Sequence, residues 1–187
     1  MANEPFKQFI LLDRGKAQYF PAYLKMIQEA WRLGIAKARK RFGTEFGGLD
    51  PQGDQFGVTT IRPEFLGVTG GEWKHTRTTG TGWQDLMNKS VKEDIIIVIV
   101  GFAWSNPDIQ ISQLKVTAAG KTLPILDVEE VKALDSPMVL LPQPLVVGDK
   151  QELIFRSYNI VNTGNEYLIP IGYAFCTKDN LYNETIA

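Results

Sequence analysis

DIIIVIVGFAW, residues 94–104, decides the fold class of this 187-residue chain. It is rich in β-branched residues, which favour strands, and it is too short to span a bilayer as a helix. Successive strand residues point to opposite faces, and here both faces are apolar, which predicts a strand covered on both sides. One face would carry Ile95, Ile97, Ile99 and Ala103, and the other Ile96, Val98, Val100, Phe102 and Trp104.

Residues 167–177 repeat this two-sided pattern near the C-terminus. Their odd positions are large, whereas Gly172, Ala174 and Cys176 make the even face smooth enough for a helix to approach closely. Pro170 indicates a sheet edge or a bulge. A two-sheet sandwich covers only its inner faces, so we expect the N-terminal segment or another protein on the outside.

The rest of the body reads as short strands separated by Gly, Pro and Asn turns, without alternating helices. This pattern indicates an antiparallel sandwich or barrel. We expect a mainly β fold, an antiparallel β-sandwich preceded by a long N-terminal amphipathic α-helix. Predicted strands cover 55–62, 65–68, 73–79, 94–104, 109–117, 121–126, 138–141, 145–147, 152–161 and 167–177, and short helical turns 83–89 and 128–134.

The helix is predicted over residues 21–42. Pro21 suits a first helical position, and Gly43 after three basic residues suits a stop. Apolar residues recur at steps of three and four, and burying each large one is worth roughly 1.5–3 kcal/mol, so the helix must dock. Docking on its own chain and on a neighbouring subunit both stay open, and we favour the neighbour. The expected oligomer or shell interface is Leu24, Met26, Ile27, Ala30, Trp31, Leu33, Ile35, Arg39, Lys40 and Arg41.

The predicted domain organisation is an arm with the helix over 1–43, a Gly-rich linker over 44–54 and a β-sandwich over 55–187. The net charge changes sign near the boundary between the arm and the linker. Residues 1–45 hold nine Lys/Arg and four Asp/Glu, a net of +5, and the remainder carries −6. Such a chain can bind an acidic surface, nucleic acid or a neighbouring copy's body, although a solvated helix face explains the basic run equally well.

Residues for catalysis or metal binding are scarce. His75 and Cys176 are the sole histidine and cysteine, too few for an ordinary zinc site, and no partner motif accompanies His75. We predict no enzyme, no catalytic, cofactor-binding or metal-binding residues, and no cofactor. The start lacks the layout of a secretory signal, and we expect no membrane partner.

Tryptophans offer one alternative function. Trp73, Trp83 and Trp104 could form a sugar-stacking platform, which would make the chain a carbohydrate-binding β-sandwich module. Alternatively, these tryptophans anchor the core or an interface. We favour this explanation because Trp83 and Trp104 adjoin apolar segments.

The layout of basic helix, Gly-rich hinge and two-sided strands resembles viral jelly-roll structural proteins, which include capsid subunits and the decoration or cement proteins of tailed viruses. The segments LPQPLVVGDKQELIFR (141–156) and YLIPIGYAF (167–175) contribute to the likeness. The resemblance implies a virion protein assembled in the host cytoplasm, with itself and other capsid proteins as partners. Because the arm is amphipathic and not a long polybasic tail, we do not expect it to bind nucleic acid directly.

Overall fold

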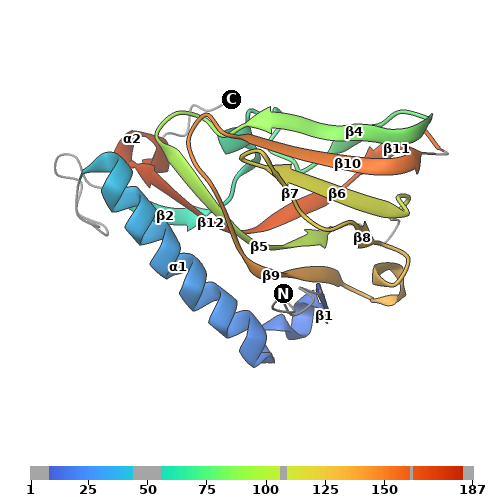
Figure 1. The fold of residues 1–187 in the computed structure, drawn as a ribbon, viewed down its shortest axis with the longest axis horizontal. Helices are drawn as coiled ribbons and strands as arrows, with labels where there is room; N and C mark the ends of the chain where they lie inside the picture. The colour runs from blue at the N-terminus through green and yellow to red at the C-terminus, as the bar shows by residue number, and fades with distance from the viewer. Residues whose placement is uncertain (1–8, 44–55, 106–108, 161, 183–187) are drawn as a thin grey trace, which may run out of the picture.

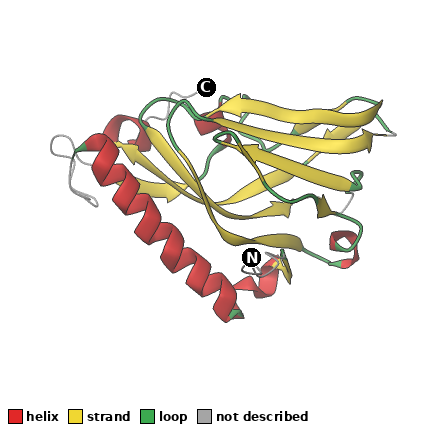
Figure 2. Ribbon diagram, viewed as in Figure 1, coloured by secondary structure: helices red, strands yellow, loops and turns green. Residues whose placement is uncertain are grey.

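The computed structural model describes residues 9–43, 56–105, 109–160 and 162–182, and it consists of two packed β-sheets with one long helix across one of them (Figure 1). The predicted linker, 44–54, lies outside the described residues. Figure 2 shows the helix on one side of the strands only.

Two antiparallel sheets form the body. The first sheet has the order β1 (Ile10–Asp13), β9 (Pro137–Val147), β5 (Ile95–Trp104), β12 (Leu168–Thr177), β2 (Phe56–Thr60). The second sheet has the order β4 (Gly80–Ser90), β10 (Glu152–Ile160), β6 (Gln113–Ala118), β7 (Lys121–Thr122), and β8 (Leu126–Asp127) also pairs with β6. A separate pair joins β3 (His75–Arg77) to β11 (Gly164–Glu166).

The pairing is nested. β2 pairs with β12, β4 with β10, β5 with β9 and β6 with β8, so the chain runs as one long antiparallel ribbon folded over into two sheets. This order is that of a jelly roll. The predicted fold class, an antiparallel β-sandwich after an N-terminal helix, is confirmed.

The long helix α1 spans Pro21–Phe42, as predicted. Pro21 occupies its first turn, and Gly43 ends it in the left-handed conformation (φ 66°), donating its N–H to the Arg39 carbonyl. The short helices are η1 (Arg14–Tyr19), η2 (Pro63–Leu66), η3 (Val131–Ala133) and α2 (Lys178–Tyr182).

Two local predictions are wrong, and both fail at positions where adjacent apolar residues break the two-residue period. The helical turn predicted over 83–89 is part of strand β4, where an irregularity opposite Phe155 and Arg156 lets Leu86 and Met87 both point inward. The strand predicted over 65–68 is instead the one-turn helix η2, whose first residue is Pro63.

Other differences concern strand ends. The strands predicted over 138–141 and 145–147 are one strand, β9, whose pairing with β5 shifts around Pro142 and Pro144, which lack the N–H a regular ladder needs. β1 and β11 were not predicted, since neither shows a clear alternating pattern. Pro170 does stand beside an irregularity, between Ile171 and Gly172, and β2 pairs with β12 only from Tyr173 onward.

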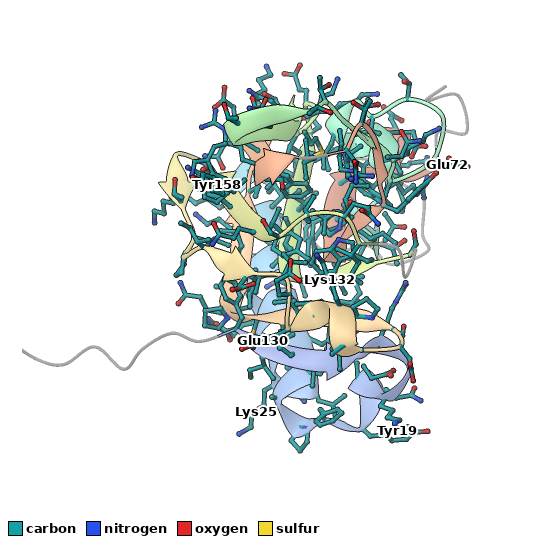
Figure 3. The ribbon with its side chains drawn as sticks, turned by 90° about the vertical axis from the view of Figure 1, so that its right-hand side faces the viewer. Tyr19, Lys25, Glu72, Glu130, Lys132 and Tyr158 are labelled. Carbon is teal, nitrogen blue, oxygen red and sulfur yellow. The ribbon has the colours of Figure 1, made fainter. Side chains whose placement is uncertain are left out.

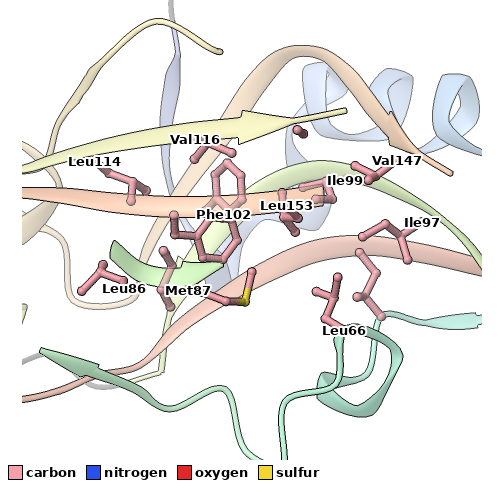
Figure 4. Packing of buried hydrophobic residues seen from close by; sticks show 14 of the residues in the cluster. Leu66, Leu86, Met87, Ile97, Ile99, Phe102, Leu114, Val116, Val147 and Leu153 are labelled. Atoms are coloured by element: carbon pink, nitrogen blue, oxygen red, sulfur yellow. The ribbon is translucent and has the colours of Figure 1, made fainter. Parts of the chain in front are cut away.

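The main core lies between the two sheets (Figure 4). The predicted faces of β5 hold for its first half, but a bulge at Gly101 then shifts the alternation, so that Phe102 and Trp104 join the core side and Ala103 turns to the other. A side chain at Gly101 would collide with the backbone of Val139, which explains the glycine. Labelled core residues in Figure 4 include Leu66, Leu86, Met87, Ile97, Ile99, Phe102, Leu114, Val116, Val147 and Leu153.

Candidate functional site

Helix α1 covers the outer face of the first sheet within the same chain. It packs on β5, β12 and β9, and this is why β5 is buried at every position. The two-sided strands were expected to be covered either by the N-terminal segment or by another protein, and the N-terminal segment covers them. Our preference for a neighbouring subunit on these faces is corrected accordingly.

Small residues on the helix itself, and not on β12, let α1 approach the sheet closely. Ala30, Gly34 and Ala38 recur every four residues and are fully or almost fully buried. A methyl group on Gly34 would overlap the ring of Phe175 from β12. We expected the small face of β12 to meet a helix, but its large residues do, while Ala174 and Cys176 face the core between the sheets.

Aromatic contacts fix the side of α1 that faces β12 and β2. The Trp31 ring meets the rings of Tyr173 and Phe175 edge-on, with centroids 5.5 and 6.3 Å apart. At the end of the helix, the rings of Phe42 and of Phe56 in β2 are tilted against each other, with centroids 6.0 Å apart. Edge-to-face pairs of this kind add to the free energy of burial.

An ion pair fastens the last turn of α1 to the body. Arg41 donates to Asp149 at 2.8 Å and lies 3.3 Å from Asp94. The Arg41 hydrogen bond lowers the pKa of Asp149 below its usual value, against the smaller opposing effect of burial. Arg41, expected at an interface between subunits, therefore binds carboxylates of its own chain.

The ten predicted interface residues divide into two groups. Five pack on the body of the same chain and Arg41 forms an ion pair with it, while Leu33 is half-buried. The five are Met26, Ile27, Ala30, Trp31 and Ile35. Leu24, Arg39 and Lys40 are exposed and stay available to a partner.

An apolar projection stands at the start of the helix, formed by Tyr19, Phe20 and Leu24. Their exposed fractions are 76%, 42% and 50%. Tyr19 is the last residue of η1, and Leu24 in the first turn of α1 donates its N–H to the Phe20 carbonyl. Figure 3 shows Tyr19 and Lys25 at the extremity of the molecule, away from the sheets. The helical period of the sequence selects Leu24 but not the two aromatic residues before Pro21.

A basic groove lies at the other end of α1. Its volume is about 650 Å³, and it runs between the last helical turns, the C-terminal part of β9 and the β6–β7 turn. Its cationic lining residues are Lys37, Lys40, Arg41 and Lys121.

The three tryptophans do not form a platform. Trp104 is buried in the core, and Trp73 is half-buried beside His75, 6.4 Å between centroids. Trp83 lies on the second sheet, 5.3 Å from Tyr158, and the ammonium of Lys115 sits 4.3 Å from its ring centroid. The prediction of a joint stacking surface is wrong, because Trp104 is inward-facing.

His75 is held as a core residue. Its Nε2 lies 2.9 Å from the Leu168 carbonyl, to which it donates, and its ring meets Phe155 edge-on. Burial lowers the pKa of His75, and the Leu168 hydrogen bond opposes this only partly. The nearby ion pair of Arg77 with Glu166, at 3.5 Å, is also buried.

The buried thiol of Cys176 has a pKa raised to about 11 by burial, which disfavours the reactive thiolate. In the described parts of the chain, no three His, Cys, Asp or Glu side chains gather to hold a metal ion. None of the helices there is long and apolar enough to cross a membrane.

Comparison with known proteins found no family model, no curated protein and no solved structure that matches this chain.

Proposed function

We propose that this protein is a non-enzymatic structural subunit, a self-associating jelly roll that builds or decorates a shell such as a virus capsid. The observation that carries the proposal is the apolar projection. Every other large apolar side chain of α1 is at least partly buried, yet Leu24 is open to water, as are Tyr19 and Phe20 just before the helix. Clustered exposed apolar side chains rimmed by polar residues mark interaction sites.

Two further features support the shell role. The nested strand order is one that capsid proteins use, although many functions share this fold. A net charge of +5 over residues 1–45 against −6 over the remainder suits contact between copies. The proposed partners are other copies and other shell proteins, and the proposed location is the virion, after assembly in the host cytoplasm.

The test is the mass of the full-length protein in solution. Light scattering after size exclusion, over a wide concentration range, should show association that the double variant Tyr19→Ser/Leu24→Ser reduces. Both side chains are largely exposed, so the variant should melt at nearly the wild-type temperature. Lys25→Ser, an exposed change on the same turn, serves as the control and should associate normally.

A wild-type protein that stays monomeric at its highest soluble concentration would contradict the proposal. If it associates, electron micrographs of the concentrated protein should show closed or repeating assemblies.

The second candidate is carbohydrate binding, because Trp83 and Tyr158 lie side by side and partly exposed on the second sheet. Titration of tryptophan fluorescence with a broad glycan panel tests it, with Trp83→Leu as the matched variant. Lys115 over the Trp83 ring stands against it, since that face is already covered.

A further inference from the structure

The basic groove carries more positive charge than its surroundings balance. Of the described residues, four cations and one carboxylate line it, and that carboxylate, Asp149, is bound by Arg41. The net charge of these side chains is +3. Among the described residues, the ion pairs leave Lys37, Lys40 and Lys121 without a carboxylate partner.

The walls of the groove suit a peptide segment. Leu145 and Val146 supply half-buried apolar surface, and Gln143 and Gln151 supply polar groups. A polypeptide with carboxylates at its surface and an apolar side chain or two would match both features. A small inorganic anion would leave the apolar wall uncovered.

Such a segment lies at the opposite end of the same molecule. Residues 127–135 hold four exposed carboxylates and a single cation, a net of −3. Lys132 pairs with Glu129 at 2.8 Å, and Ile125, 53% exposed, precedes the segment. Figure 1 places β8 and the turn after it far from the C-terminal end of α1. Figure 3, which views the molecule from the β8 side, labels Glu130 and Lys132 there.

We propose that the basic groove of one copy receives residues 127–135 of a second copy. The charges are equal and opposite, and Ile125 can cover the apolar wall. Because groove and segment occupy opposite ends, each contact leaves one free groove and one free segment, so copies add head to tail. The product is a ring if the rotation between copies closes and a filament if it does not. This inference rests on the proposed self-association and names one surface that would make it.

The test uses two charge-reversed proteins. In one, Lys37→Glu/Lys40→Glu makes the groove acidic, and in the other, Glu129→Lys/Glu130→Lys makes the segment basic. Each alone should associate at least about tenfold more weakly than wild type, since attraction becomes repulsion at two positions. An equal mixture should associate more strongly than either reversed protein alone, because each reversed surface then finds a surface of opposite charge.

Controls separate this contact from other contacts. Lys89→Glu, exposed on β4, changes charge away from the groove and should associate as wild type does. Melting temperatures near wild type would show that the reversed proteins fold. Raising the salt concentration should weaken wild-type association, as expected for exposed charges.

The outcomes are distinguishable. If wild type associates but salt and both reversals leave its mass unchanged, the groove contact is wrong while self-association stands. If the reversals dissociate the protein but the mixture does not recover, the pairing of groove with segment is wrong. A monomeric wild type would overturn both this inference and the proposed function.

Discussion

Replacing Gly34 by alanine tests the docking of α1, because two effects of opposite sign meet at this position. In a free helix the change would stabilise by about 1 kcal/mol, the usual penalty of a mid-helix glycine. In the folded chain the new methyl group overlaps the fully buried ring of Phe175. Overpacking a filled core costs about 1–3 kcal/mol, and this overlap, with several ring atoms, belongs at the upper end.

The packing cost exceeds the gain in helix propensity, so we expect Gly34→Ala to lower the free energy of unfolding by a net of about 1–2 kcal/mol. For a chain of this size that lowers the melting temperature by about 2–8 °C. Equilibrium urea unfolding followed by circular dichroism measures the free energy, and a thermal melt measures the shift.

Two companion variants isolate the cause. Ala36→Gly, at an exposed position of the same helix, should lose only the propensity of about 1 kcal/mol. In a Phe175→Leu background, Gly34→Ala should cost less than in wild type, since the smaller side chain leaves room for the methyl group. A Gly34→Ala protein more stable than wild type would refute docking of α1 on β12.

Three further predictions concern titratable groups. Arg41 lowers the pKa of Asp149, so the stability that their ion pair contributes should be present above pH 3.8 and be lost as the pH falls through the lowered pKa of the folded state. Asp149→Asn should therefore be slightly less stable than wild type at pH 7 and should lack this part of the acid dependence. Urea unfolding at a series of pH values measures both effects. Burial lowers the pKa of His75, so the free energy of unfolding of the wild type should decline as the pH falls below 6.5. His75→Phe should remove this pH dependence. It should also lower the free energy of unfolding at pH 7 by about 1–3 kcal/mol, because the Leu168 carbonyl loses its hydrogen bond. The thiol of Cys176, with a pKa of about 11, should react with a disulfide reagent only as the protein unfolds, and rapid labelling of native protein would contradict its burial.

The sequence predicts long elements with an unbroken period well. The helix over 21–42 has proline at its first position and glycine just after its last, and the strand over 95–104 is apolar throughout, so local chemistry and tertiary packing agree. Bulges and irregular pairing defeat the prediction, because an extra residue shifts the alternation. Leu86 and Met87 therefore mimicked a helical spacing, and Gly101 moved Phe102 to the other face.

Interaction surfaces were harder to predict. Two-sided apolar strands require a cover, but the pattern cannot say which chain supplies it, and here α1 does so in the same chain. The groove unites residues 37–41, 118–121 and 143–151, which only the folded ribbon brings together. Tyr19 and Phe20 precede the helix, outside the periodic pattern, and so were not selected.

The nested ribbon fixes when the helix can dock during synthesis. α1 is synthesised well before β12, yet β12 supplies part of the surface on which α1 packs. Until β12 joins β5, the small-residue stripe of α1 and its flanking apolar side chains have no matching surface in the nascent chain. Contacts this distant in sequence form slowly, and the apolar side of α1 stays uncovered until they do.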